Sequence, residues 1–339
     1  MKTTTTIVSA GLCLLAVTAW GQSYFNTSSG LWTNAGNWAG GVPNAGTDTY
    51  IGYGSPYVTP ATATLDAGSS GATKQLIVGG IGLAGPTTAN TGTLNLQGSL
   101  SVNGTFAAGW SGTGTVVQTS GSSVNVNNNF LYLAVRTRDA GTYQLSGGVL
   151  TNVSILRIGY GPNSVGNFTL SGSSTLLQAG AAQFGLDSGA VGTLLQTGGT
   201  WNSGAITLGA ASGGQGTYQI TGGTLTNASI TIGGANNGSA GTFTVGGTAA
   251  VWLKGLTVAS GVAYATGTVT MTGGTWDNGG QNITLASGSQ CAATMSVTGG
   301  TLTNLSGLTL GGASGGTGSL TLGGTAQIFS TGGWTVGNG

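Results

Sequence analysis

The chain has 339 residues, of which 70 are Gly, and Asp, Glu, Lys and Arg together make up only 3%. A formal net charge of +1 and so few charged residues exclude the basic surface of a nucleic-acid-binding protein and the charge density of a disordered tail. Hydrophobic residues still reach 39% and mostly alternate with Thr, Ser and Asn, which is typical of many short strands joined by Gly-rich turns. The composition therefore predicts an all-β protein.

Residues 1–21 have the pattern of a secretory signal peptide. Lys2 precedes an apolar run from Ile7 to Ala19, and we expect cleavage near the small residues Ala19 and Gly21. The protein is therefore predicted to be secreted or to reach the cell surface. Removing Lys2 from the six basic residues leaves five, against five acidic ones, so we expect no attraction to nucleic acid or to an anionic membrane. No other apolar run is long enough to span a membrane.

Residues 22–60 differ from the rest and are predicted to form an N-terminal Trp-rich cap. Trp32 and Trp38 flank a turn rich in Asn and Gly, and Pro43 breaks the chain after it. A stack of repeats exposes its apolar core and an open strand edge at its end, so bulky aromatic residues are expected to cover that end. The alternative is that Trp32 and Trp38 expose their ring faces and stack on sugars.

Residues 61–339 consist of repeats and form the predicted β-helix domain. Successive coils are 24 to 27 residues apart and start at Gly114, Gly141, Gly166, Gly192, Gly216, Gly241, Gly267, Ala293 and Gly318. A period near 25 residues accommodates three short strands and three turns, and such units bury their apolar sides only by stacking on their neighbours. We therefore predict a right-handed parallel β-helix with three-strand coils.

Alternation within each strand separates the core from the surface. In the third strand of a coil, pairs such as Ile230 and Ile232 are predicted to point inward, because side chains two residues apart share one face. Trp201 and Trp276 replace the Leu that other coils carry in the second strand. We expect both of these Trp side chains in the core rather than at a binding surface.

The turns around the second strand also repeat. Gly pairs such as Gly198-Gly199 precede it and supply the positive φ of a sharp corner. Asn follows it, and stacked Asn residues are predicted to form a ladder of amide hydrogen bonds at Asn152, Asn227, Asn278 and Asn304. The coils that start at Gly166 and Gly241 have Leu177 and Trp252 in this place and represent a second coil type.

The outward residue of the third strand is Thr in six consecutive coils. The candidate ligand contacts on this face are Thr207, Thr231, Thr257, Thr284 and Thr309, and Thr335 continues the rank. One interpretation is that Thr simply suits an exposed strand and bonds to the next Thr in the stack. A flat, uncharged rank could also contact a polysaccharide or, as a remote alternative, ice, since ice-binding β-helices have similar Thr arrays.

The charged residues do not form the cluster that an enzyme needs. The five acidic residues fall on different coils, at Asp48, Asp66, Asp139, Asp187 and Asp277. The densest charge is the loop 136–139, which is predicted to be a solvated turn with a local ion pair. The alternative is that this loop makes a minor contact with an anion. With no His, no Glu and only Cys291 after residue 21, the sequence offers neither an activated nucleophile nor a first-row metal site. We therefore expect no catalytic residue, no cofactor and no metal ion.

One pattern near the N-terminus resembles a known family. The spacing W-x5-W-x3-V-P-x4-D, at Trp32, Trp38, Val42, Pro43 and Asp48, precedes coils of the type G-T-y-x-q/l-t-G-G-t-l-t-N. Together these motifs resemble secreted bacterial proteins with autotransporter-associated β-strand repeats, many of which end in a PEP-CTERM sorting tail. The resemblance implies a β-helical surface protein. The sequence stops within a repeat, so a chain truncated at its C-terminus is expected.

Two functions remain open from the sequence. The first is a non-enzymatic extracellular or cell-surface β-helix with a structural or adhesin-like role, which the signal peptide and the repeats favour. The alternative is a carbohydrate-binding or carbohydrate-active β-helix with an extracellular polysaccharide as its partner, which the Trp pair favours.

Overall fold

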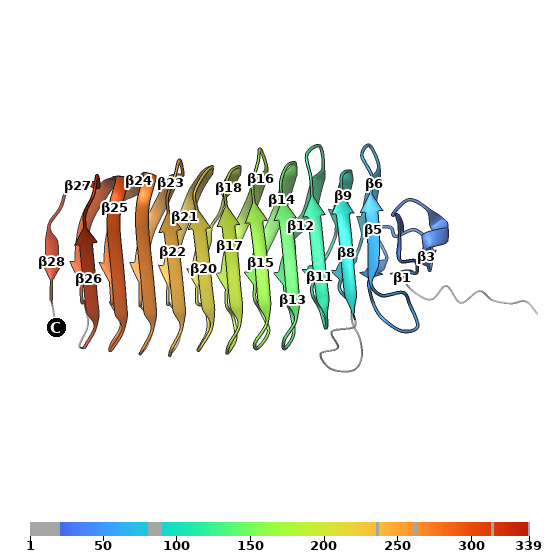
Figure 1. Cartoon of the computed structure of the whole chain (residues 1–339), viewed down its shortest axis with the longest axis horizontal. Coiled ribbons are helices and arrows are strands. Elements are labelled where there is room, and N and C mark those ends of the chain that lie inside the picture. The colour runs from blue at the N-terminus through green and yellow to red at the C-terminus, as the bar shows by residue number, and fades with distance from the viewer. Residues whose placement is uncertain (1–20, 81–89, 235–236, 261–262, 313–314, 338–339) are drawn as a thin grey trace, which may run out of the picture.

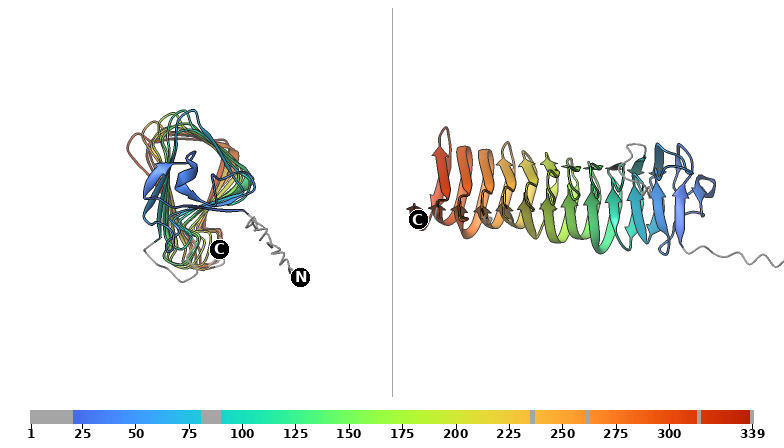
Figure 2. Two further views of the ribbon diagram at one scale, coloured as in Figure 1. Left: turned by 90° about the vertical axis from the view of Figure 1, so that its right-hand side faces the viewer. Right: turned by 90° about the horizontal axis from the view of Figure 1, so that it is seen from below.

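The computed structural model describes residues 21–80, 90–234, 237–260, 263–312 and 315–337. Within these residues the chain is a parallel β-helix of about eleven turns, so the predicted fold class is confirmed. Figure 1 shows a straight rod in which the coils follow one another in sequence order and wind right-handed. Seen along the axis, the coils superimpose on a single outline (Figure 2). The predicted signal peptide lies outside the described residues, except for Gly21.

Each coil contributes strands to three stacks. The first-strand stack consists of β2 (Ser29–Leu31), β5 (Ala61–Leu65), β8 (Thr91–Leu96), β11 (Thr113–Gln118), β13 (Ala140–Leu145), β15 (Val165–Leu170), β17 (Val191–Gln196), β20 (Gln215–Ile220), β22 (Ala240–Val245) and β26 (Thr317–Leu322). The third-strand stack includes β1 (Gln22–Phe25), β4 (Asp48–Ile51), β7 (Gln75–Val78), β10 (Phe106–Ala108), β19 (Ala205–Leu208) and β28 (Trp334–Val336).

The second-strand stack includes β6 (Ser70–Thr73), β9 (Ser99–Val102), β18 (Thr200–Asn202) and β27 (Gln327–Ser330). Several strands turn the corner and belong to more than one stack, namely β12 (Ser123–Leu133), β14 (Val149–Ile158), β16 (Thr175–Phe184), β21 (Thr224–Ile232), β23 (Ala250–Val258), β24 (Thr266–Leu285) and β25 (Ala292–Leu310). The one helix of the described residues is the short 3₁₀ turn η1 (Ala35–Asn37). No helix there is long and apolar enough to cross a membrane.

The strand register confirms the predicted coil starts. Gly114 pairs with Gly141 and Gly216 with Gly241, and the stack also extends one coil earlier, to Gly92. A Cβ on Gly216 would lie 2.4 Å from the backbone nitrogen of Gly209, where the third strand of the preceding coil ends. Glycine recurs here because no side chain fits between these two backbone segments.

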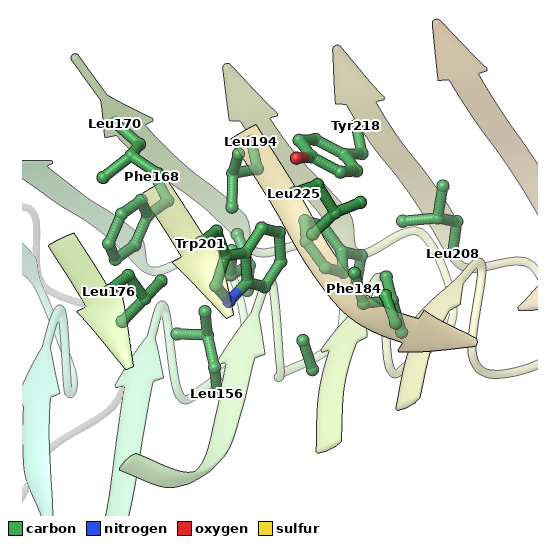
Figure 3. Packing of buried hydrophobic residues seen from close by; sticks show 14 of the residues in the cluster. Leu156, Phe168, Leu170, Leu176, Phe184, Leu194, Trp201, Leu208, Tyr218 and Leu225 are labelled. Atoms are coloured by element: carbon green, nitrogen blue, oxygen red, sulfur yellow. The ribbon is translucent and has the colours of Figure 1, made fainter. Parts of the chain in front are cut away.

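The interior is a continuous stack of apolar side chains. Ile230 and Ile232 are buried, as predicted, and Trp201 and Trp276 are both fully inaccessible. Figure 3 shows Trp201 among apolar side chains of neighbouring coils, including Phe184. Because this stack extends from the first coils to Leu308, every inner coil buries its apolar side against two others.

The corners agree with the predicted Gly pairs, but the Asn ladder is not continuous. Gly199 has φ +71°, as the corner requires, and Asn152, Asn227 and Asn304 adopt the left-handed conformation with φ between 53° and 62°. Each of these Asn amides donates one bond to the residue one position earlier in the preceding coil: Asn152 to Asn125, Asn227 to Asn202 and Asn304 to Asp277. The structure therefore contains separate rungs, because coils of the second type interrupt the series.

Asn278 departs from the prediction altogether. Its side chain is fully buried, and its Nδ2 donates to the Gln281 carbonyl at 2.7 Å. Gly279 and Gly280 take the positive φ values at this turn, 60° and 72°. Since two glycines supply the left-handed conformation, Asn278 is free to turn inward and bond locally. Its assignment to the outer ladder is wrong.

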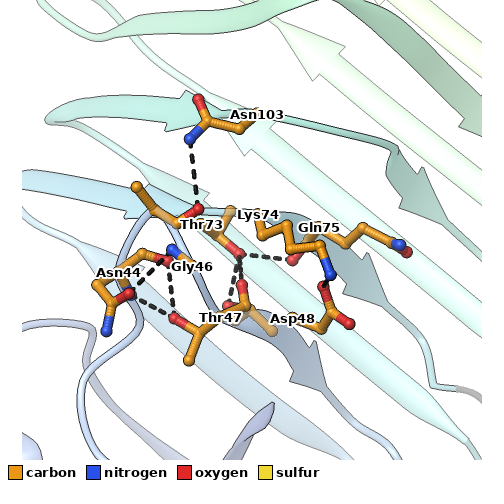
Figure 4. Close-up of polar contacts among 10 residues, drawn as sticks. Asn44, Gly46, Thr47, Asp48, Thr73, Lys74, Gln75 and Asn103 are labelled. Atoms are coloured by element: carbon orange, nitrogen blue, oxygen red, sulfur yellow. Dashed lines mark hydrogen bonds and ion pairs between the residues drawn. The ribbon is translucent and has the colours of Figure 1, made fainter. Parts of the chain in front are cut away.

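The N-terminal region is continuous with the coils. β1 pairs antiparallel with β3 (Trp38–Ala39) and parallel with β4, and β4 pairs in register with β7. Figure 4 shows polar contacts that tie the turn before β4 to the next coil, among them Thr73 Oγ1 donating to the Thr47 carbonyl at 2.8 Å and the ion pair of Lys74 with Asp48 at 3.6 Å. The stack thus begins inside the region predicted as a cap.

Candidate functional site

Trp32 and Trp38 do not form a sugar-stacking surface. Their exposed fractions are 0% and 6%, and their rings pack edge to face with centroids 5.0 Å apart. Trp38 Nε1 donates to the Trp32 carbonyl at 2.7 Å, and Phe25 packs against the Trp38 ring. Both rings therefore close the apolar end of the stack, and the expectation that they contact a ligand is wrong, because no ring face is open to one.

The predicted Thr rank is aligned in the structure. The register pairs Thr207 with Thr231 and Thr231 with Thr257, and continues through Thr284 and Thr309 to Thr335. From Thr207 to Thr309 the side chains are half-buried. The corner after the strand comes close to Thr231, since a Cβ on Gly234 would lie 2.1 Å from Thr231 Cγ2. These Thr residues form a half-buried line along the third-strand face, which we call the Thr track.

The Thr hydroxyls do not bond to one another along this track. None of the rank from Thr207 to Thr309 has a hydroxyl hydrogen bond to another residue in the described part of the chain. The hydrogen bonds between successive Thr residues that the sequence suggested are therefore not formed there. The hydroxyls stay available to water or to a ligand that lies along the rod.

A second Thr rank on the first-strand face escaped the sequence analysis. It comprises Thr93, Thr115, Thr142, Thr193, Thr217, Thr242, Thr268 and Thr294, with Asn167 in the one interrupting coil. The signal was the Thr that follows the Gly at each coil start. The flanking outward positions vary, as Val117 and Gln144 illustrate, so this face is less uniform than its central rank.

Coils of the second type carry a large apolar side chain on the outside. Leu177 and Trp252 are 40% and 47% exposed, and Phe329, in the coil that starts at Gly318, is 57% exposed. Leu177 pairs with Asn202 and Trp252 with Asp277, so these side chains stand one position before the Asn turn rather than in it. The alignment assumed from the sequence was off by one residue at this turn.

The Thr track continues toward the N-terminus as a different surface. In register before Thr207 come Gln183, Arg157, Tyr132, Ala107, Ile77, Tyr50 and Tyr24. A second line of side chains follows the third strand at the corner, and the two lines pack into a cluster separate from the core, made of Tyr24, Tyr50, Tyr53, Ile77, Ala107, Trp110, Tyr132, Val135 and Tyr160. We call this cluster, with Arg157, the outer aromatic face.

Ring stacking orders the N-terminal end of the outer aromatic face. Tyr24 stacks on Tyr50 with centroids 4.9 Å apart and on Tyr57 with centroids 4.1 Å apart. Burial, followed by the negative charge of Asp48, raises the pKa of Tyr50 to about 12. The phenol therefore stays protonated and neutral at physiological pH.

A cation orders the other end of the outer aromatic face. The Arg157 guanidinium lies 5.4 Å from the centroid of the Tyr132 ring and 4.7 Å from that of Tyr160, within the range of cation–π attraction. Arg157 Nε donates to Gln183 Oε1 at 3.1 Å. Rings from two coils and an amide from a third therefore hold this guanidinium in place.

Residues 136–138 of the loop 136–139 are exposed, as predicted for a solvated turn, but Asp139 forms no ion pair within the described part of the chain. Asp139 is 2% exposed, and its Oδ2 accepts hydrogen bonds from the backbone nitrogens of Ser111 at 2.8 Å and Arg136 at 2.7 Å. Burial raises the pKa of this carboxyl group, although the backbone bonds oppose the rise. Asp139 thus fixes the loop between two coils. Within the described residues, no group of three His, Cys, Asp or Glu could hold a metal ion.

Comparisons with known proteins add no relative. No protein-family model matches the chain, and neither a curated protein nor a solved structure matches it.

Proposed function

We propose that this chain is an extracellular or cell-surface β-helix without catalytic activity, which serves as a rigid rod and adheres through its outer faces. The observation that carries the proposal is the unbroken stack of coils, each of which presents corresponding residues at the same place on the outside. At about 4.8 Å per coil, roughly eleven turns make a rod on the order of 50 Å long. Repeated weak contacts along such a rod add up to firm attachment.

The signal-peptide pattern and the family resemblance support the proposed extracellular or cell-surface location. The pattern of a signal peptide covers residues 1–21, and β1 begins at Gln22, so cleavage there removes no strand. The resemblance to autotransporter-associated repeat proteins, including those with PEP-CTERM tails, points to the same compartment. The outer faces suit it as well, since they are rich in Thr, Ser and Asn and carry few charges.

Two measurements test this proposal. The full chain with a C-terminal tag is produced in a bacterial host, and we expect N-terminal sequencing of the exported protein to start near Trp20 or Gln22. Beads coated with the protein are then expected to adhere to bacterial cells or extracellular matrix more than beads coated with albumin. Uncleaved protein retained inside the cells would contradict the location, and equal adhesion of both bead types would contradict the adhesive role.

The outer aromatic face favours carbohydrate binding as a second candidate function. Aromatic rings stack on the apolar faces of sugars, and here the rings that could do so are Trp110, Tyr132 and Tyr160 rather than the buried Trp pair. Ice binding by the Thr track is tested separately, by adding micromolar protein to growing ice crystals. Unchanged crystal shape would end that alternative.

A further inference from the structure

Three of the basic residues lie together beside the outer aromatic face. The chain after residue 21 has only five, and the two elsewhere are Lys74 and Lys254. Arg157 stands on β14, and Arg136 and Arg138 belong to the loop that follows β12. Because the molecule has so few charges, these three arginines make this part of its surface locally basic.

The two segments that carry these arginines touch. The Arg138 backbone nitrogen donates to the Pro162 carbonyl at 3.0 Å. A Cβ on Gly161 would lie 2.5 Å from the carbonyl carbon of Arg136. Gly161 directly follows Tyr160, whose ring lies under the Arg157 guanidinium. The loop 136–138 therefore lies at the edge of the surface that holds Arg157.

Carboxylates near this cluster are engaged elsewhere. Asp139 is buried and turned toward backbone nitrogens, as described above. Asp187, on a neighbouring loop, is exposed and accepts a hydrogen bond from the Ser188 backbone nitrogen at 2.7 Å. The ion pair that the described residues form, between Lys74 and Asp48, lies near the N-terminal end. None of the three guanidinium groups has a carboxylate of the described chain within ion-pairing distance.

Arg157 is also arranged to accept a partner. Its Nε donates to Gln183 and its guanidinium carbon lies over the Tyr132 and Tyr160 rings, whereas its two terminal nitrogens have no hydrogen bond to any described residue. A guanidinium presents two parallel N–H groups that match a carboxylate or a sulfate. Because the rings and the amide fix the side chain in advance, little rotamer freedom is lost when such a group binds.

The side chains around Arg157 favour a sugar over a nucleic acid as the ligand. The half-buried Trp110 ring suits the apolar face of a sugar ring, while Tyr132 and Tyr160, which lie under the guanidinium, line the site beside it. Beyond Gln183 the same line continues as the uncharged hydroxyls of the Thr track, which offers no cation for a row of phosphates. An acidic polysaccharide fits this surface. Its acidic groups suit the cluster of arginines, and the hydroxyls of its chain suit the uncharged, hydrogen-bonding Thr track.

We propose that Arg157, with Tyr132, Tyr160 and Gln183, binds an acidic sugar residue of an extracellular polysaccharide whose chain continues along the Thr track. The site takes a uronate or a sulfated sugar through paired hydrogen bonds to the guanidinium and ring contacts to the sugar. This site names the class of ligand for the proposed adhesive function, and the inference rests on that function. Arg136 and Arg138 add positive charge at the edge of the site.

The test is direct binding of the purified chain to defined polysaccharides. Immobilised polygalacturonate is the main probe, and its fully methyl-esterified form has the same backbone without the charge. Alginate and dextran sulfate extend the test to a second uronate and to sulfate, and single-stranded DNA tests a different anion. The variants are Arg157→Gln, Arg157→Lys and Tyr160→Leu, with Lys254→Gln as the matched loss of a charge elsewhere. Urea unfolding of each variant establishes that it is folded.

We expect the unmodified chain to bind at least one of the acidic polysaccharides and to bind methyl-esterified polygalacturonate about tenfold more weakly than polygalacturonate. Arg157→Gln is expected to weaken acidic polysaccharide binding by about tenfold or more, Arg157→Lys less, and Lys254→Gln by less than about twofold. Folded Arg157→Gln with unchanged affinity, or equal binding to the charged and esterified polymers, would overturn the proposal. So would tighter binding to DNA than to every acidic polysaccharide.

Failure with all three acidic polysaccharides also overturns this site. That outcome leaves the adhesive rod open, because the coated-bead assay measures adhesion without reference to sugar charge. Conversely, sugar binding by a chain whose coated beads do not adhere would support the site and remove the adhesive role. The two proposals therefore fail on different measurements.

Discussion

Removing the phenol hydroxyl of Tyr218 is expected to destabilise the rod although the change is only one atom. Tyr218 is fully buried, and its hydroxyl donates to Gln196 Oε1 at 2.6 Å. Gln196 is equally buried and occupies the place that Leu170 and Ile220 hold in the adjoining coils. Tyr218→Phe leaves the amide oxygen of Gln196 inside the core without a donor. An unsatisfied buried acceptor of this kind costs about 1–3 kcal/mol.

The double substitution separates the hydrogen bond from the packing. Gln196→Leu alone leaves the Tyr218 hydroxyl without its acceptor. It also leaves the Thr224 carbonyl, which accepts from Gln196 Nε2 at 3.0 Å, without this donor. This variant too is therefore expected to lose about 1–3 kcal/mol of stability. Combined with Tyr218→Phe, it removes both buried partners and makes the coil resemble its neighbours. We expect the double variant to be more stable than the sum of the single losses predicts, by about 1–2 kcal/mol.

Equilibrium urea unfolding followed by Trp fluorescence measures these differences, since the Trp201 ring lies 5.2 Å from that of Tyr218. The chain contains a second copy of the arrangement, in which Tyr143 donates to Gln118 Oε1 at 2.6 Å, and the same cycle there should give the same sign. Tyr264→Phe, at a ring that is 63% exposed, is the control. Additive losses in both cycles, or a Tyr218→Phe variant as stable as the unmodified chain, would refute the reasoning.

The other predictions concern pH, packing and a turn. Burial raises the pKa of Tyr143 and Tyr218 above the ordinary value near 10, so the stability that comes from keeping them neutral is complete below about pH 10 and is lost as the pH rises toward the folded pKa. Urea midpoints between pH 9 and pH 11 should fall, and should fall less in the Tyr-to-Phe variants; a parallel decline would contradict this. Trp201→Ala is expected to cost about 3–5 kcal/mol and Trp252→Ala less than about 0.5 kcal/mol, because only the first ring is buried, and equal urea midpoints would disprove it. Asn227→Ala is expected to cost about 1 kcal/mol, since φ is 62° there and the bond to Asn202 is lost, whereas Asn227→Gly should retain more of the stability in the same assay.

The repeat made much of the fold predictable from the sequence. A constant period aligns equivalent residues, and alternation along a strand assigns them to the inside or the outside, so the core positions of Trp201 and Trp276 and the Thr207 to Thr335 rank followed from the sequence. Turns were harder to predict. Asn278 has the position of the outer Asn residues, but the two glycines after it let its side chain turn inward.

Sequence alone determined that this is a parallel β-helix of stacked coils, because only stacking buries the apolar side of so short a repeat. The candidate site depended on tertiary structure. Sugar stacking by Trp32 and Trp38 stayed open as an alternative to capping until the fold placed both rings over the end of the core. Tyr132, Arg157 and Gln183 are 25 and 26 residues apart along the chain, and they meet because parallel coils bring successive repeats into register. The sequence suggested at most a minor anion contact at the loop 136–139, whereas folding brings all three arginines of the chain beside one set of rings.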